Sequence, residues 1–385
     1  RDGGALTLDG VSIYGTSQAH FSLPYPSGIF VGSSAVLTLR NATVAECSNA
    51  EAAPQQALAG HGGALTLHSG AVVDLVHVVF RANTAASSGG ALAVSGSAAL
   101  HLDSVTFDAN TALGAFGSGI GGGAIAISGF DVSLAITAST FSANLATASS
   151  GGALSLALTG SANTLRVTNS TLLGNTAGGM GGGVALVGLA TLDIVSSSLD
   201  GNSAVWGGAI AATRTALVLS ARSMYGTDST APGGRVALLN TGIANSFADY
   251  GGTFFACEST IDAEHAVITG SSHAAVGGGF AFFCFPHNDA WLADPLTASP
   301  SPPTTAGYGP NRATSTASLA LELPVPSSVM SGVAFGAGAV AVYDGYGALV
   351  RDNSIALAPT VDQPTAFAAA GIEAGGVDGS WFQPF

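Results

Sequence analysis

Short runs in which apolar and polar residues alternate recur along the first three quarters of the chain. They include LHLDSVTF at 100–107, VSLAITASTF at 132–141, LRVTNSTL at 165–172 and LDIVSSSL at 192–199. Alternation with a period of two predicts β-strands, because successive side chains of a strand point to opposite faces. Gly, Ser and Ala residues separate the runs, so we expect each strand to end in a turn.

A pair of glycines precedes many of these runs, mostly at intervals of 25–33 residues. Glycine permits a positive φ and a close backbone approach where a turn leads into a strand. The first interval is 59 residues, which leaves room for two repeats. The elements are GGALTL at 3–8 and 62–67, GGALAV at 89–94, GGAIAI at 122–127, GGALSL at 151–156, GGVALV at 182–187, GGAIAA at 207–212, GGTFFA at 251–256 and GGFAFF at 278–283.

A second element, Phe-x-x-Asn, recurs between the glycine pairs. It stands as FRAN at 80–83, FDAN at 107–110 and FSAN at 141–144, and weakens to LLGN at 172–175 and LDGN at 199–202. VAEC at 44–47 takes the same place within the long first interval.

Repeats with about three short strands each cannot close a core alone, so the chain predicts an all-β solenoid, a parallel β-helix. Residues at one phase of such a stack lie about 4.8 Å apart. We therefore expect asparagine amides hydrogen-bonded along the axis, beside a stack of apolar rings. The predicted ladder is Asn83, Asn110, Asn144, Asn175 and Asn202; the predicted stack is Phe80, Phe107 and Phe141, continued by Leu172 and Leu199.

The combination of GGA[I/L/V] and FxxN elements over roughly residues 1–285 resembles the repeats of the chlamydial polymorphic membrane proteins. Those proteins carry surface passenger domains built as right-handed β-helices. The resemblance therefore implies a right-handed parallel β-helix in a cell-surface setting. The chain lacks the membrane barrel of that family, so the resemblance says nothing of a secretion route.

Three cysteines occur, Cys47, Cys257 and Cys284. The last two share a phase on consecutive repeats, because each lies five residues after the second glycine of a pair. Stacked neighbours about 4.8 Å apart fall within the usual Cα separation of a disulfide. We predict a bridge between Cys257 and Cys284, with Cys47 free; two small buried side chains that stack without bonding are the alternative.

The composition changes after Pro286, and we divide the chain into a β-helix (1–290), a Pro/Ser/Thr-rich linker (291–317) and a C-terminal β segment (318–385). ASPSPPTT at 298–305 resembles the hydroxyproline-rich segments of algal wall glycoproteins, although a plain polyproline II linker has the same composition. AVAVYDGYGALV at 339–350 resembles bacterial immunoglobulin-like repeats, with a hairpin turn after Tyr343. This segment is either part of a sandwich that continues in a longer protein or a cap on the solenoid.

Charge is scarce: 8% of residues are charged, all nine basic residues are arginine, and the net charge is −14. A nucleic-acid partner is therefore not expected, since phosphate binding needs Lys and Arg. Gly, Ser, Thr and Asn interrupt every apolar stretch, so no membrane span is expected in this chain. The sequons Asn41-Ala-Thr and Asn169-Ser-Thr are candidate N-glycosylation sites, and Arg1 is expected to begin a processed or trimmed fragment.

Polysaccharide lyases and hydrolases often use β-helices, so an enzyme is the alternative class. Such chemistry needs carboxylates that converge on one face. The column six residues before the Phe position holds Asp74, His101, Ala135, Arg166 and Asp193, and the column one residue after it holds Arg81, Asp108, Ser142, Leu173 and Asp200, so the acids are dispersed. The densest ionisable cluster is Glu258, Asp262, Glu264 and His265, which we interpret as a solvated loop.

We therefore predict no catalytic residue, no metal site and no cofactor. The expected function is a non-enzymatic structural or adhesive module, a rigid rod in an extracellular, cell-wall or filament assembly. Its expected partners are copies of itself, other matrix proteins and glycans. The enzyme alternative would place its site on the loop between Asn110 and Gly122 or around Glu258–Asp262.

Overall fold

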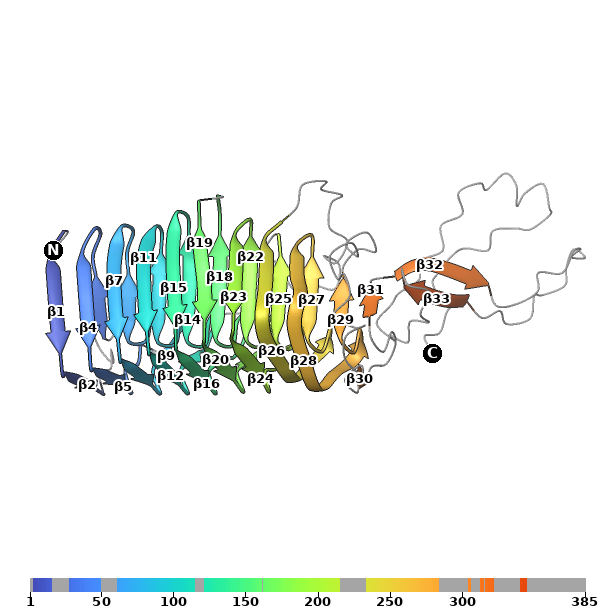
Figure 1. The fold of residues 1–385 in the computed structure, drawn as a ribbon, viewed down its shortest axis with the longest axis horizontal. Helices are drawn as coiled ribbons and strands as arrows, with labels where there is room; N and C mark the ends of the chain where they lie inside the picture. Colours follow the sequence, from blue (N-terminus) through green and yellow to red (C-terminus); the bar gives the residue numbers. More distant parts are fainter. Residues whose placement is uncertain are drawn as a thin grey trace, which may run out of the picture.

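The computed structural model describes residues 3–15, 28–49, 61–114, 121–160, 162–214 and 233–283, together with short strands at 304–305, 312–314, 316–321 and 340–344. Within these residues the chain is all β and coils into a column of stacked parallel strands (Figure 1). This confirms the predicted parallel β-helix.

One face of the column is a ten-stranded parallel sheet among the described residues, to which each coil contributes one strand. Its strands are β3 (Ile29–Val31), β6 (Leu65–Leu67), β10 (Leu92–Ser95), β14 (Ile125–Gly129), β18 (Leu154–Leu158), β22 (Val184–Gly188), β25 (Ile210–Thr213), β27 (Phe254–Cys257), β29 (Ala281–Phe283) and β31 (Arg312–Thr314).

A second, larger sheet contains two rows of strands. The first row is β1 (Ala5–Asp9), β4 (Val36–Arg40), β7 (Ala71–Val76), β11 (Ala98–Asp103), β15 (Val132–Thr137), β19 (Thr164–Thr168) and β23 (Thr191–Val195). The second row carries the Phe position and is β2 (Ser12–Tyr14), β5 (Thr43–Ala45), β8 (Val79–Arg81), β12 (Thr106–Asp108), β16 (Thr140–Ser142), β20 (Thr171–Leu173) and β24 (Ser198–Asp200). The two rows join in the long strands β26 (Arg235–Tyr250) and β28 (Thr260–Gly277), and β30 (Thr304–Thr305) pairs with β28.

A four-stranded sheet of two-residue strands completes the coils: β9 (Thr84–Ala85), β13 (Thr111–Ala112), β17 (Leu145–Ala146) and β21 (Thr176–Ala177). Corners between the rows use residues with positive φ, such as Ser104 (57°) before β12 and Ala109 (52°) after it. The glycine pair marks the corner before the ten-stranded sheet. Gly122 has a φ of 69°, and a Cβ on its neighbour Gly123 would lie 2.2 Å from the carbonyl oxygen of Gly152 in the next coil.

The core is one continuous apolar column inside the coils. Alternate residues of the larger sheet's strands from β4 to β23 enter it, as the sequence pattern predicts. Leu65, Leu92, Ile125 and Leu154 form one such row and are each 0% exposed. Leu37, Val73, Leu100, Leu134 and Leu165 form a facing row on the larger sheet.

Two of the glycine elements occupy other places than the sequence suggests. Residues 3–8 belong to the larger sheet, because Ala5 pairs with Val36 in β4. The pattern of two glycines and an alternating run is the same on both faces, and only the stacking partner distinguishes them. In the element at 182–187 the corner glycines are Gly181 and Gly182, since Val184 pairs with Leu154.

The solenoid continues past residue 290, the boundary suggested by composition, because β30 and β31 extend two of its sheets from within the predicted linker. Beyond it, β32 (Thr316–Leu321) and β33 (Val340–Asp344) form an antiparallel pair. The predicted partner of β33 was the segment after Asp344. That segment, and most of the proposed immunoglobulin-like region, lies outside the described residues.

Candidate functional site

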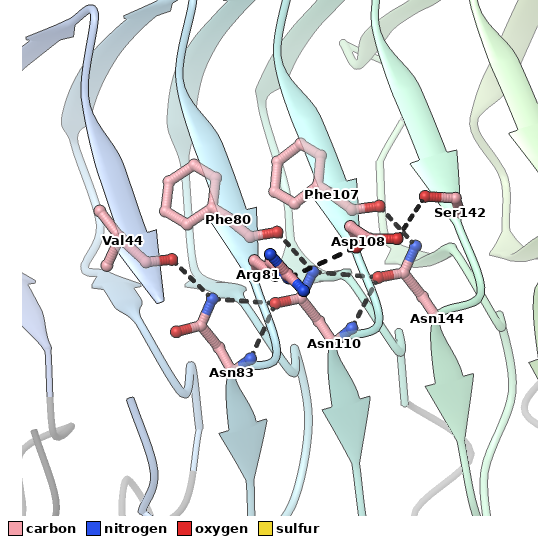
Figure 2. A network of polar contacts seen from close by, with 9 residues as sticks. All are labelled: Val44, Phe80, Arg81, Asn83, Phe107, Asp108, Asn110, Ser142 and Asn144. Carbon is pink, nitrogen blue, oxygen red and sulfur yellow. Dashed lines mark hydrogen bonds and ion pairs between the residues drawn. The ribbon is translucent and has the colours of Figure 1, made fainter. Parts of the chain in front are cut away.

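The five predicted asparagines lie in one column at the corner after the Phe row, and each is 0% exposed. In each of these coils the residue directly before the asparagine has a positive φ and makes the corner: Ala82, Ala109, Ala143, Gly174 and Gly201. This left-handed turn directs each amide into the core, where it faces the amides of the adjacent coils (Figure 2).

Each internal amide of this asparagine ladder uses all of its hydrogen-bonding capacity. The Oδ1 of Asn110 accepts from the backbone N–H of Asn83 at 3.0 Å and from its Nδ2 at 2.9 Å. The Nδ2 of Asn110 donates to the carbonyl of Phe80 at 3.0 Å and to the Oδ1 of Asn144 at 3.0 Å. The position requires an uncharged side chain that donates two hydrogen bonds and accepts two. Among side chains of this length only Asn does so.

Other residues occupy the ladder position at its two ends. Cys47 stands there in the coil before Asn83, and its backbone N–H donates to the Oδ1 of Asn83 at 3.0 Å. Its free, buried thiol contacts the carbonyl of Ala45. After Asn202 the position is taken by Ser246, which is 2% exposed. The sequence element VAEC at 44–47 therefore occupies the Phe-x-x-Asn place, as its spacing predicts.

The rings of Phe80, Phe107 and Phe141 lie above one another beside the ladder. Their centroids are 5.0 and 4.8 Å apart and the planes are within 8° of parallel. Leu172 and Leu199 continue the column at 0% exposure. The spacing equals the rise of one coil, so the stacked rings follow from the strand register.

The exposed side of the larger sheet carries the column of Asp74, His101, Ala135, Arg166 and Asp193 in the predicted register. Asp74 lies between Arg40, at 3.3 Å, and the Nδ1 of His101, at 2.8 Å. Asp193 is four strands away from Asp74 along the axis. This column contains a local ion-pair network and no second carboxylate beside the first.

The column one residue after the Phe position also has the predicted register. Its members are Arg81, Asp108, Ser142, Leu173 and Asp200. Arg81 lies 3.8 Å from Asp108, and the Ser142 hydroxyl donates to Asp108 at 2.7 Å. Asp200 accepts from Asn245 at 2.9 Å. Each acid has a partner from the adjacent coil, and these partners neutralise or satisfy it without forming a carboxylate pair.

The predicted ionisable cluster is only partly described. Asp262 forms an ion pair with Arg235 of the preceding coil, and Glu258 forms a corner with a φ of 51°. The side chains of Glu264 and His265 lie outside the described residues, as does most of the loop between Asn110 and Gly122. Where the side chains are described, no group of three or more His, Cys, Asp or Glu residues has a geometry suited to a metal ion.

A contact that the sequence did not indicate joins His61 and Ser88 at the edge of the ten-stranded sheet. The Nδ1 of His61 is hydrogen-bonded to the Ser88 hydroxyl, and Ser88 is 4% exposed. Thr66 and Asn49 donate to the His61 carbonyl at 2.7 and 3.1 Å. These bonds secure the turn before the glycine pair.

The outward face of the ten-stranded sheet is also buried toward its C-terminal end, which was not predicted from the sequence. Phe255 and Phe282 point out of the core, stack 5.9 Å apart and are covered by Trp206, Tyr250 and Met180. The consecutive apolar residues of GGTFFA and GGFAFF are the signal, since a strand buried on both faces shows no alternation.

The predicted disulfide lies at the margin of the described residues. Phe254 pairs with Ala281 and Ala256 with Phe283, so the same register would place Cys257 opposite Cys284. Cys284 lies outside the described residues, and the bridge stays a prediction. The sequon asparagines Asn41 and Asn169 are both exposed at corners of the larger sheet, with φ values of 49° and 50°.

Comparison of the chain with protein-family models, with curated proteins and with solved structures finds no match. No helix among the described residues is long and apolar enough to cross a membrane. Inferences about function therefore rest on the geometry of the coils and on the chemistry of the sequence.

Proposed function

We propose that this chain is a non-enzymatic structural module, a stiff rod that serves in a cell-surface, cell-wall or filament assembly. The observation that carries the proposal is the unbroken asparagine ladder, in which five buried amides link six successive coils, from that of Cys47 to that of Asn202. A buried polar network that is fully satisfied rigidifies a fold, because bending it would leave donors unpaired in an apolar surrounding.

The arrangement of the coils supports the same role. Each coil stacks on its neighbours, so the stability of the rod is built from nearest-neighbour interfaces that repeat along the axis. Ten strands in one sheet at about 4.8 Å per step give a column about 43 Å long. Asp74, Asp108 and Asp262 are paired locally with Arg40, Arg81 and Arg235, an arrangement suited to a surface and not to acid–base catalysis.

An extracellular setting is part of this proposal. The predicted bridge between Cys257 and Cys284 would persist in an oxidising compartment, and the two sequons suit a secreted chain. The resemblance of the repeats to those of bacterial surface proteins points the same way. The proposed partners are further copies of the chain, other matrix proteins and glycans.

A polysaccharide cleavage screen tests the proposal against the enzyme alternative. The purified chain is incubated with uronate and neutral polysaccharides, and new reducing ends and unsaturated products are measured. We expect none, together with self-association in sedimentation or retention on a glycan column. Turnover that is lost in Asp74→Asn or Asp262→Asn, and kept in the exposed control Asp131→Asn, would overturn the proposal.

A further inference from the structure

One corner of the larger sheet is built in the same way in eight of the described coils. The residue three positions before the Phe position has a positive φ and stands at the turn between the two rows of strands. The column is Gly10, Asn41, His77, Ser104, Ala138, Asn169, Ser196 and Asn240, with φ between 49° and 66°. All but the half-buried Ser104 are exposed.

The fold also determines the next two residues after this corner. The first turns into the core, as do Ala42 at 4% and Ser170 at 2% exposure. The second begins the Phe-row strand and is surface threonine in several coils: Thr43, Thr106, Thr140 and Thr171. Asn is favoured among non-glycine residues at a left-handed position. Corner Asn and strand Thr together make the sequon Asn-x-Thr.

We propose that Asn41 and Asn169 are N-glycan acceptors and that both glycans lie on this single edge of the β-helix. The two corners are separated by four strand steps, through Thr43, Val79, Thr106, Thr140 and Thr171. At about 4.8 Å per step the attachment points are about 19 Å apart along the axis. The sequence has no other Asn-x-Ser/Thr sequon, so the other faces of the column carry no N-linked sugar.

The transfer needs a glycosyl donor of the lipid-linked oligosaccharyl diphosphate class. The Asn Nδ2 forms a bond to the anomeric carbon, the bond from that carbon to the diphosphate oxygen breaks, and the lipid diphosphate leaves with the electron pair. The Nδ2 gives one proton to a base of the transferase and keeps the other. Asn41 can therefore retain its bond to Asp9, whose Oδ1 lies 2.9 Å away.

This inference rests on the proposed extracellular role, because the donor is met only on a secretory route. It also adds a constraint to that role. A glycan at each of two points about 19 Å apart shields the corner, so lateral association of rods would use the ten-stranded side or the short four-stranded sheet.

The test is occupancy of the two asparagines in protein isolated from its source. Peptide N-glycosidase in ¹⁸O-water converts a glycosylated Asn to ¹⁸O-labelled Asp, which peptide mass spectrometry locates. We expect label at Asn41 and Asn169. Asn240 is the internal control: it occupies the same exposed corner with a φ of 50° but is followed by Thr241-Gly242 and must stay unlabelled.

The location of the same sample is measured by antibody binding to intact cells. A surface-exposed chain without label at either asparagine overturns this inference and leaves the rod function standing. A chain found only inside cells overturns the proposed extracellular role and this inference with it.

Variants made in a secreting eukaryotic host test the geometry itself. Thr43→Val should remove the glycan at Asn41 without disturbing the strand, because Val79 occupies that position one coil later. Ala138→Asn creates Asn-Ser-Thr at an exposed corner of the same column and should add one glycan. Failure of Ala138→Asn to gain a glycan in folded protein would show that the corner does not present an acceptor.

Discussion

Replacing Asn144 by alanine removes one amide from the middle of the ladder. Its Oδ1 is the acceptor for two bonds, from the backbone N–H of Asn110 at 3.0 Å and from the Nδ2 of Asn110 at 3.0 Å. Its Nδ2 donates to Phe107 at 3.0 Å and to Asn175 at 2.9 Å. Because the site is 0% exposed, water does not replace these partners.

The cost comes from the groups left behind. Two buried donors of Asn110 lose their acceptor, at about 1–3 kcal/mol each. A small cavity adds to this loss, so we expect Asn144→Ala to lower the free energy of unfolding by about 3–5 kcal/mol, at the upper end for single substitutions. The matched control is Asn169→Gly in the neighbouring coil, an exposed residue at a φ of 50°, where glycine is tolerated and the change should stay within about 0.5 kcal/mol.

Asn144→Asp keeps the shape of the side chain and removes its two Nδ2 donors, so it separates the effect of hydrogen bonding from that of packing. The carboxyl still accepts from Asn110, but it places an oxygen against the Phe107 carbonyl and the Oδ1 of Asn175. Burial and these oxygens raise the folded-state pKa of the introduced carboxyl above its unfolded value of about 3.9. At this group the folded state then binds more protons than the unfolded state, so stability relative to the unsubstituted chain is highest in acid and falls as the pH rises, by at most about 1.4 kcal/mol per pH unit.

Urea unfolding followed by circular dichroism gives the free energies, and amide exchange at Asn110 locates the change. A loss below about 1 kcal/mol for Asn144→Ala, or one no larger than that of Asn169→Gly, refutes the reasoning. So does an Asn144→Asp variant that becomes more stable, relative to the unsubstituted chain at the same pH, as the pH rises from acid to neutral.

The same stack makes three further predictions. Phe107→Ala should cost about 3–5 kcal/mol in urea unfolding and Phe107→Leu less than about 1.5, since leucine fills this column in later coils; equal costs would contradict the ring stack. Gly152→Ala should prevent folding or strongly lower the urea midpoint of unfolding, because its Cβ would lie 2.1 Å from a carbonyl oxygen of the next coil. The control Gly160→Ala has nothing within 4 Å of its Cβ, so it should cost only the strain of a φ of 77°. Unfolded protein is alkylated with and without prior reduction, and the intact mass is measured. If Cys257 and Cys284 are bridged, the reduced sample should carry two more labels than the unreduced one. The bridge is disproved if both cysteines are labelled without reductant.

Register was the part of the site most accessible from sequence. The distance from each Phe position fixes a phase, and the structure places His101 beside Asp74 and Asp108 beside Arg81 as that phase requires. The glycine pairs were a less reliable guide to which sheet a strand joins, because residues 3–8 share their pattern with 62–67 but lie on a different sheet. A local pattern specifies a strand and its inward side, while the choice of face depends on which strand it stacks against.

The sequence by itself determined the β-helix, the inward residues and the identity of the side chains that stack, because a repeat places equivalent residues at equal heights. The sequence predicted bonds between the amides along the axis, and the tertiary structure alone decided which backbone groups complete them. The left-handed turn at Ala109 directs the next amide inward, the coil of Cys47 supplies the end of the ladder, and aromatic residues from successive loops cover the outer face at Phe255. These features depend on directions in space and on neighbours far apart in the chain, which a pattern along one dimension does not encode.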